Sequence, residues 1–213
     1  METLRRELIA SGTDISACKR ILDFGCGAGR MLRWLAYLAD ECELWGTDVS
    51  AEHILWCQQH LSPPFRFVTT TSCPHLPFED CYFDLVYAGS VFTHIPDLAD
   101  AWLLEIRRIL RPGGLAYLTV HDRSTLQCLE RTPRRPLARR LSSLPESLRF
   151  WRHDFGMFTI KRGFGSLVFY EEAFIRRHWG RFFDILRLVP EAYECQTALL
   201  LSKATGFPNR CRS

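Results

Sequence analysis

Between residues 20 and 121 the chain alternates between short apolar runs and longer stretches with helical periodicity. The apolar runs, such as Arg20–Phe24 and Asp84–Ala88, have the length and the flanking turn residues of strands. The stretches between them carry apolar side chains every three or four residues, as one face of a helix requires. Strands and helices that alternate at these lengths form a parallel sheet with helices on both faces. The sequence therefore predicts an α/β fold.

The expected elements follow one another with few interruptions. Before residue 121 we expect strands at 20–24, 43–48, 65–70, 84–88 and 115–120, and helices at about 31–38, 51–61 and 98–110. Ser50 and Asp97 are the expected N-caps of the second and third helices, and Pro112 ends the third. Near the end of the chain we expect a helix at 170–179 and strands at 182–189 and 196–202, joined by a turn that contains Pro190. The first ten residues predict a charged helix.

A glycine-rich turn follows the first expected strand and opens the first long helix. Glycines at 25, 27 and 29 allow the backbone to turn tightly and to approach a ligand closely, and the free N–H groups of the helix start face that ligand. Asp23, just before the turn, would repel a pyrophosphate but attract a cationic group. Position 30, where a dinucleotide-binding loop needs glycine, is Arg30. The turn therefore favours a cationic ligand such as S-adenosylmethionine over NAD.

A second acid, Asp48, ends the second expected strand, 19 residues after Gly29. At the tip of a strand beside this turn, a carboxylate accepts hydrogen bonds from both hydroxyls of a ribose. This role fits any adenosine cofactor, so Asp48 does not by itself distinguish a methyl donor from NAD.

Four motifs in this order resemble the class I S-adenosylmethionine-dependent methyltransferases, specifically the small methyltransferase-domain group of types 11 and 12. The motifs are residues 21–29 (ILDFGCGAG), 46–50 (GTDVS), 76–78 with 83–88 (LPF and FDLVYA), and 108–114 (RILRPGG). They cover about half of the chain. The resemblance implies a Rossmann-like, doubly wound sheet of seven strands in the order 3-2-1-4-5-7-6, the last antiparallel.

The resemblance also implies roles for individual residues. The loop Gly25, Cys26, Gly27 and Gly29 would hold the methionine part of the cofactor together with Asp23, Asp48 would hold the ribose, and Val49 would lie against the adenine. Family members often carry an acid after the third strand that binds the adenine amine; here Ser72 and Cys73 occupy that place. Ala88, Gly89 and Ser90 would face the methyl group that is transferred.

Two histidines are the expected catalytic residues. His121 follows the fifth expected strand and His94 follows the fourth, at the sheet edge where such folds bind ligands. A base assists a hydroxyl or a protonated amine, although methyl transfer requires chiefly alignment and exclusion of water. Weaker candidates are Asp122, His153, Asp154 and Tyr170. Structural roles for His94 and His121 remain open alternatives.

Residues 122–169 interrupt the alternation and form the expected substrate-side insertion. From Arg123 to Arg152 there are eight arginines and two glutamates. These cations would attract an anionic acceptor, a carrier-protein phosphopantetheine or a membrane surface, or would be merely solvated. The arginines singled out are Arg131, Arg134, Arg135, Arg139 and Arg140. The aromatics Phe150, Trp151, Phe155, Phe158, Phe164 and Phe169 either line a pocket or form a small core, and residues 155–169 predict a β-hairpin.

Composition bounds the remaining questions. The 213 residues carry a net charge of +3, which gives little support for nucleic-acid binding, and no apolar run approaches the length of a transmembrane segment. The nine cysteines are scattered without a metal-ligand or disulfide pattern, so we expect reduced thiols, a cytoplasmic protein and no metal site.

We expect one domain, residues 1–204, consisting of an N-terminal helix (1–20), a cofactor-binding core (21–121), the insertion (122–169) and a C-terminal helix with two strands (170–204), followed by a flexible tail (205–213). The expected function is methyl transfer from S-adenosylmethionine to a small molecule, anionic or carrier-bound acceptors included. Alternatives are a non-catalytic relative, an RNA methyltransferase and an NAD-dependent oxidoreductase. The oligomeric state is left open.

Overall fold

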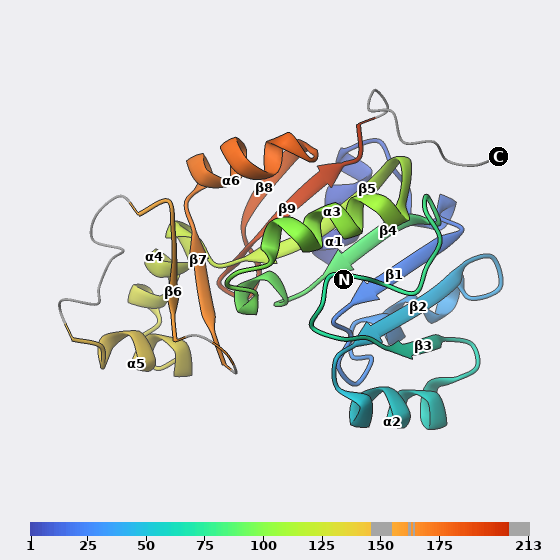
Figure 1. Ribbon diagram of the computed structural model, residues 1–213, viewed down its shortest axis with the longest axis horizontal. Helices are drawn as coiled ribbons and strands as arrows, with labels where there is room; N and C mark the ends of the chain where they lie inside the picture. Colours follow the sequence, from blue (N-terminus) through green and yellow to red (C-terminus); the bar gives the residue numbers. More distant parts are fainter. Residues whose placement is uncertain (146–154, 162, 164, 205–213) are drawn as a thin grey trace.

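Seven strands form one sheet in the order β3-β2-β1-β4-β5-β9-β8 (Figure 1). The computed structural model describes residues 1–145, 155–161, 163 and 165–204. The strands are β1 (Arg20–Phe24), β2 (Glu43–Asp48), β3 (Arg66–Thr69), β4 (Phe83–Ala88), β5 (Leu110–Val120), β8 (Asp184–Tyr193) and β9 (Gln196–Ser202). The first five are parallel, and β9 pairs antiparallel with both β5 and β8. The predicted fold class and strand order are confirmed.

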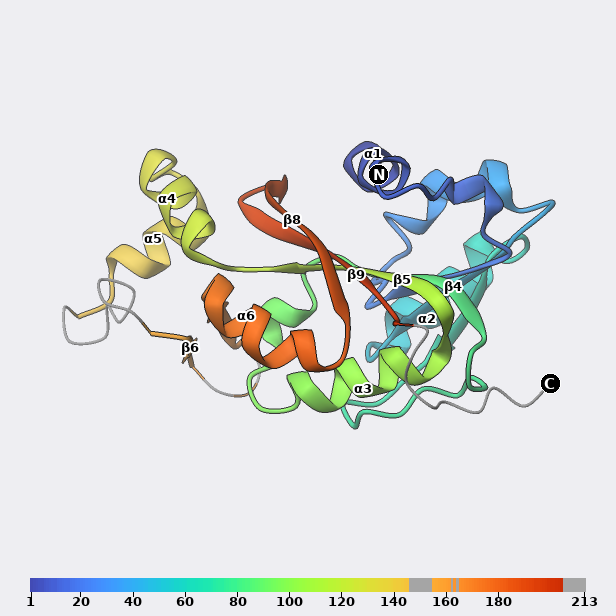
Figure 2. The same cartoon turned by 90° about the horizontal axis from the view of Figure 1, so that it is seen from above.

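Helices cover both faces of this sheet (Figure 2). They are α1 (Glu2–Ala10), η1 (Ile15–Ala17), η2 (Leu32–Leu38), α2 (Ala51–Leu61), η3 (Phe92–His94), α3 (Ala99–Ile109), α4 (Arg123–Arg131), α5 (Pro136–Ser142), α6 (Glu172–His178) and η6 (Trp179–Arg181). Side chains of α1, η2 and α2 share one core with alternate strand residues such as Ile21, and α3 and α6 share the other with Leu22. Each fully buried leucine or isoleucine contributes about 1.5–3 kcal/mol.

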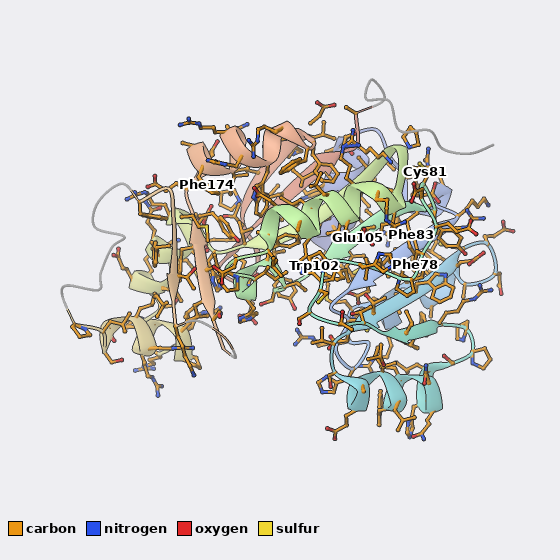
Figure 3. The ribbon with its side chains drawn as sticks, in the orientation of Figure 1. Phe78, Cys81, Phe83, Trp102, Glu105 and Phe174 are labelled. Carbon is orange, nitrogen blue, oxygen red and sulfur yellow. A yellow bond between two sulfur atoms is a disulfide. The ribbon has the colours of Figure 1, made fainter. Side chains whose placement is uncertain are left out.

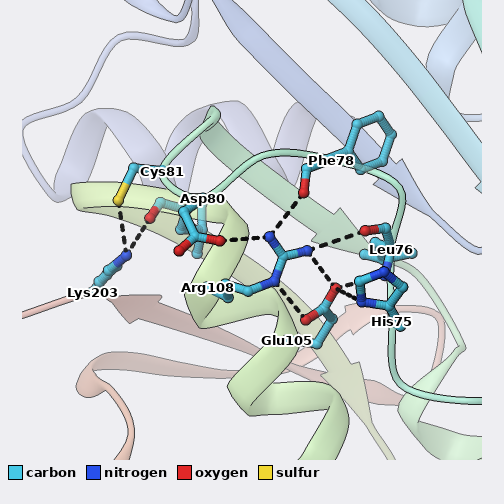
Figure 4. Close-up of polar contacts among 9 residues, drawn as sticks. His75, Leu76, Phe78, Asp80, Cys81, Glu105, Arg108 and Lys203 are labelled. Atoms are coloured by element: carbon cyan, nitrogen blue, oxygen red, sulfur yellow. Dashed lines mark hydrogen bonds and ion pairs between the residues drawn. The ribbon is translucent and has the colours of Figure 1, made fainter. Parts of the chain in front are cut away.

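Arg108 of α3 fixes the loop between β3 and β4, which is the loop that carries Ser72 and Cys73 (Figure 4). Its guanidinium donates hydrogen bonds to the carbonyl oxygens of Leu76 (3.1 Å) and Phe78 (2.8 Å). The same group pairs with Glu105 at 2.7 Å and with Asp80 at 2.7 Å.

Glu105 completes this network from the buried side of α3. Its carboxylate accepts a hydrogen bond from the Leu76 amide at 2.5 Å. Burial alone would raise the pKa of Glu105, but the bonds from Arg108 and Leu76 lower it below its usual value. Figure 3 labels the aromatic side of the same region, where the rings of Phe78 and Phe83 meet edge to face with centroids 4.8 Å apart.

The insertion folds against the carboxyl end of the sheet, away from α2 and β3 (Figure 1). It contains α4, α5 and a two-stranded antiparallel sheet of β6 (Met157–Ile160) and β7 (Leu167–Tyr170). The predicted hairpin is confirmed. Phe155, Phe158 and Phe169 belong to a small apolar core within the insertion, so they support this segment and do not line an open pocket. Phe150, Trp151 and Phe164 lie outside the described residues, as do residues 205–213.

A disulfide joins Cys128 of α4 to Cys195 in the turn between β8 and β9, with Cα atoms 5.7 Å apart. The expectation that all nine cysteines are reduced is therefore wrong for this pair. The two positions are 67 residues apart, and only the docking of α4 on the C-terminal hairpin brings them together. Ion pairs from Arg131 to Glu191 and from Arg135 to Glu194 cross the same contact.

Three local expectations differ from the structure. Residues 32–38 form a 3-10 helix, which suits buried leucines at 32, 35 and 38 because this helix has three residues per turn. Helix α3 begins at Ala99 with Leu98 as its N-cap, so Asp97 lies one residue too early to cap it. The turn between the last strands is at Glu194 and Cys195, and Pro190 lies within β8 where the register with β9 shifts. Among the described residues, no helix combines the length and hydropathy that crossing a bilayer demands.

Replacing Cys128 and Cys195 with serine should destabilise the protein in the absence of reductant, because the crosslink closes a long loop. We expect a loss of about 2–4 kcal/mol in the free energy of unfolding, measured by urea denaturation. The exposed thiol Cys73 is the control, and Cys73→Ser should leave stability unchanged. Failure to find a Cys128–Cys195 linked peptide by mass spectrometry of the oxidised protein would contradict the pairing.

Candidate active site

The glycine-rich turn after β1 leaves open space beside its backbone. Gly25 and Gly27 have φ angles of 77° and 52°, in the left-handed region that favours glycine. A Cβ at Gly25 would lie 2.4 Å from Val91, whereas no atom lies within 4 Å of a Cβ built on Gly27. The amides of Gly25 and Cys26 bond to the Thr47 carbonyl on β2, and the Cys26 side chain is buried in the core. The Cys26 side chain is therefore not available to a ligand, whereas the backbone at Gly27 is.

Asp23 is buried at the carboxyl end of β1, with 2% of its surface exposed. Its Oδ2 and the nearby buried hydroxyl of Tyr87 make no hydrogen bond of normal geometry among the described residues, although the two groups are close enough that Tyr87 acts to lower the pKa of Asp23. Burial, reinforced by the negative charge of Asp48, raises the pKa of Asp23 to about 7. A buried carboxylate oxygen without a partner is costly, and a cationic donor such as an ammonium group would satisfy it.

Asp48, at the end of β2, is held in place by the backbone. Its Oδ2 accepts a hydrogen bond from the Gly27 amide and its Oδ1 from the Ser50 amide, both at 2.8 Å. Each carboxylate oxygen has further acceptor capacity, so the group can also receive two hydroxyl donors. The adjacent Val49 is 63% exposed, which leaves an apolar surface beside Asp48 for a flat ring. Ser72 and Cys73 are also exposed, in the loop after β3.

The end of β4 is held by a ring of hydrogen bonds that the sequence did not reveal. Ser90, which follows Ala88 and Gly89, has a φ of 62°. Its amide donates to Thr119 Oγ1 at 2.7 Å, and its Oγ accepts from Gln196 Nε2 at 2.9 Å. Thr119 in turn donates to Gln196 Oε1 at 2.6 Å. The sequence offered one signal for this ring of hydrogen bonds. Thr119 is a polar residue within the largely apolar strand β5, and Gln196 begins the largely apolar strand β9.

The C-terminal hairpin also reaches the glycine-rich turn. Arg30 donates to the hydroxyl of Tyr193 at 2.6 Å, and the ring of Tyr193 lies 3.5 Å from a Cβ built on Gly89. In the sequence, Arg30 served only to argue against a dinucleotide-binding loop, which needs glycine at this position. In the structure it connects the helix start to a strand 163 positions later.

His121 lies at the end of β5 with 4% of its surface exposed. Its ring stacks on Phe169 at a centroid distance of 4.9 Å, and its Nδ1 has no partner among the described residues. Burial, together with the positive form of nearby His94, lowers the pKa of His121 to about 4. His121 is therefore neutral at physiological pH and presents an unsatisfied ring nitrogen.

His94 is exposed and has a different environment. Its Nδ1 lies 2.7 Å from the carbonyl oxygen of Ser166. Because a carbonyl only accepts, Nδ1 carries the proton in this contact. His94 is thereby positioned by the loop before β7, and its ring is close enough to affect His121 electrostatically.

A cavity of about 330 Å³ lies between the carboxyl end of the sheet and the insertion. It is lined by His94, His121, Ser90 and Gln196 from the sheet side, and by Arg140 and Leu137 of α5. A second cavity of about 210 Å³ shares His121, Leu137 and Gln196 with the first and extends toward Arg135 and Glu194. The two predicted catalytic histidines and the predicted Ser90 are thus brought together, along with Gln196 and Arg140.

The weaker candidates have structural roles or cannot be placed. Asp122 caps α4 by accepting a hydrogen bond from the Thr125 amide at 2.9 Å. Tyr170 is buried, and its hydroxyl donates to the Ile95 carbonyl at 3.4 Å. His153 and Asp154 lie outside the described residues. Among the part of the chain that is described, no cluster of three or more His, Cys, Asp or Glu side chains is arranged for a metal ion.

Known proteins resemble this chain over the core of the sheet. A sequence model described as a methyltransferase domain matches residues 22–118. The methyltransferase GfsG of Streptomyces halstedii is 34% identical over 119 residues, which are 53% of this chain and 42% of that protein. The fatty-acid O-methyltransferase of Mycolicibacterium smegmatis is 34% identical over 97 residues, which are 45% of this chain and 35% of that protein. The chain spans less than half the length of these curated relatives.

A solved structure is similar over nearly the whole chain. The magnesium protoporphyrin IX methyltransferase of Synechocystis, with bound S-adenosylhomocysteine, has a TM-score of 0.63 and 18% identity. The similarity covers 95% of this chain and 81% of that chain. At this level of identity the likeness concerns the fold alone.

Replacing His121 with phenylalanine should make the protein less sensitive to acid. As the pH falls from 6.5 toward 4, the unfolded chain binds a proton on His121 that the folded chain excludes, so stability decreases over this range. The contribution is at most about 3 kcal/mol. Urea denaturation of His121→Phe and wild type at several pH values measures it, with the exposed His53→Gln as control. If the difference in unfolding free energy between His121→Phe and wild type did not change with pH, His121 would take up a proton as readily in the folded protein as in the unfolded chain.

Proposed function

We propose that the protein is a class I S-adenosylmethionine-dependent methyltransferase that transfers a methyl group to an oxygen, nitrogen or carbon atom of a small molecule; the match of residues 22–118 to a methyltransferase-domain model supports this. The observation that carries the proposal is the buried Oδ2 of Asp23, which has no partner among the described residues and lies beside a glycine turn with open space at Gly27. This arrangement fits a ligand with an ammonium group.

The proposed cofactor residues divide between two strand ends and two loops. Asp23 would pair with the ammonium group of the methionine part, and the backbone of Gly25, Cys26, Gly27 and Gly29 would surround that part. Asp48 would accept the ribose hydroxyls and Val49 would lie against the adenine, with Ser72 and Cys73 at its amine. Ala88, Gly89 and Ser90 would face the sulfonium. When bound, S-adenosylmethionine supplies an electrophilic methyl group and a good leaving group.

The cavity between the sheet and the insertion is the proposed acceptor site. The hydrogen-bond ring of Ser90, Thr119 and Gln196 holds the end of β4 in one conformation, so that it can orient the acceptor. α5 and Leu167 of β7 line the other side of the cavity. His121 and His94 are the proposed catalytic residues.

The environment of His121 defines what it can contribute. A neutral imidazole with a free Nδ1 accepts a hydrogen bond from an acceptor hydroxyl and orients it. Because burial lowers its pKa to about 4, complete transfer of a proton to His121 is unfavourable in the free protein. This suits a nucleophile that is already ionised or that loses its proton late.

Relatives support a small-molecule acceptor. One relative is named for fatty-acid O-methylation and another for phthiotriol and phenolphthiotriol dimycocerosates. We propose no nucleic-acid partner. The cytoplasmic location stays a prediction.

Calorimetric titration with S-adenosylhomocysteine tests the proposal. We expect saturable binding by the wild type and binding weaker by about tenfold or more in Asp23→Asn and Asp48→Asn, because each removes a charge-assisted contact. Asp40→Asn, at an exposed position after η2, should bind like the wild type. Wild-type protein that does not bind S-adenosylhomocysteine would favour a non-catalytic relative, and preferential binding of NAD would favour a dinucleotide enzyme.

The same titration should depend on pH through Asp23. Its pKa is about 7 in the free protein, and only the ionised carboxylate attracts an ammonium group, so affinity should increase as the pH rises through 7. Asp23→Asn should remove this dependence, whereas His94→Gln should retain it. An affinity that does not change between pH 6 and pH 8 in the wild type (about one unit either side of the Asp23 pKa) would contradict the assignment.

A further inference from the structure

The cavity between α5 and the sheet has a marked charge composition. Among the described residues that line it there is one permanent cation, Arg140, and no carboxylate. The other polar groups that line it are two imidazoles, a hydroxyl and an amide, from His94, His121, Ser90 and Gln196. We propose that this cavity binds the anionic group of the methyl acceptor, a carboxylate or a phosphate, through Arg140; this rests on the proposed function of the same site.

Arg140 differs from the neighbouring arginines of the insertion. Arg131 and Arg135 are paired with Glu191 and Glu194 across the contact with the C-terminal hairpin. No ion pair within the described part of the chain involves Arg140. One of its guanidinium nitrogens donates to the carbonyl oxygen of Gly165 at 3.2 Å, which holds the side chain between α5 and the β6–β7 hairpin. Its remaining donors are available for a planar, two-oxygen anion.

His121 is the second, independent sign of a ligand at this place. It lines both cavities, is 4% exposed, and its Nδ1 lacks a partner among the described residues. A buried polar atom without a partner is costly unless a ligand satisfies it. An acceptor that bears a hydroxyl can donate to Nδ1 while its anionic group contacts Arg140.

The same composition disfavours other acceptors. A cationic amine would enter a cavity that offers the guanidinium of Arg140 and no carboxylate, and would be repelled by it. A neutral acceptor would leave the guanidinium without a charged partner on the cavity side. The cavity volume of about 330 Å³ is at the lower end of ligand pockets, which suits an acceptor of about one aromatic ring.

Matched ring compounds test the inference. The probes are 4-hydroxybenzoate and phenyl phosphate as anions, 4-hydroxybenzamide as the neutral analogue and 4-hydroxybenzylamine as the cation. Each is titrated calorimetrically into the protein, with and without S-adenosylhomocysteine. We expect one or both anions to bind at millimolar concentrations or below, and the amide and the amine to bind more weakly. The two anions distinguish a carboxylate site from a phosphate site.

Two variants of adjacent arginines provide the matched comparison. Arg139 and Arg140 are both exposed residues of α5, but only Arg140 lines the cavity. Arg140→Gln should weaken binding of the anion by roughly 10- to 100-fold, as expected for loss of a charge-assisted hydrogen bond, and should leave the amide unaffected. Arg139→Gln should bind the anion like the wild type, although it has lost the same charge.

The outcomes separate this inference from the proposed function. Equal effects of the two variants would mean a general field of positive charge and would overturn the assignment to Arg140. Tighter binding of the amide or the amine than of the anions, or no binding of either anion, would overturn the inference that the acceptor is anionic. Binding of S-adenosylhomocysteine in the same experiment would still support the proposed function. Anion binding without S-adenosylhomocysteine binding would retain the anion site and reject the proposed function.

Discussion

The buried carboxylate of Asp23 is the constraint around which the candidate site is organised. Removing a charge from water is costly, and here burial raises the pKa of the group to about 7 and leaves Oδ2 without a partner among the described residues. The glycine turn beside Asp23 leaves open space, because Gly27 has no side chain and no other atom lies within 4 Å of the position that its Cβ would take. A buried carboxylate at the carboxyl end of β1 is therefore stabilised if a cationic ligand binds beside it, as we propose.

The C-terminal hairpin connects the parts of the site that are far apart in sequence. Consecutive residues at its turn contact four different regions: Tyr193 contacts Arg30, Glu194 pairs with Arg135, Cys195 bonds to Cys128, and Gln196 joins Ser90 to Thr119. Because β9 runs antiparallel to β5, with Thr197 opposite Val120, this turn lies at the carboxyl end of the parallel strands. One short segment thus positions the insertion, the end of β4 and the helix after the glycine turn relative to one another.

The insertion combines a structural and a ligand-facing role. Its aromatic side chains form a small core, and a leucine and an arginine of α5 face the cavity. The paired arginines dock the segment, whereas Arg140 remains available toward the cavity. The positive charge that is conspicuous in the sequence therefore divides into groups with different functions, which is visible only once their partners are known.

The sequence by itself determined the alternating strands and helices, the glycine turn and the acids Asp23 and Asp48 at strand ends, because these depend on local patterns. The strand order followed from the resemblance of four ordered motifs to a known family, and the structure has that order. The sequence also placed His94, His121 and Ser90 at one edge, since the carboxyl ends of parallel strands lie together. Only the tertiary structure showed that Cys128 and Cys195 form a disulfide and that Gln196 joins Ser90 and Thr119 in a ring of hydrogen bonds. It also showed that Arg140, unlike Arg139, lines the cavity. These features depend on contacts between residues tens of positions apart, for which spacing along the chain carries no signal.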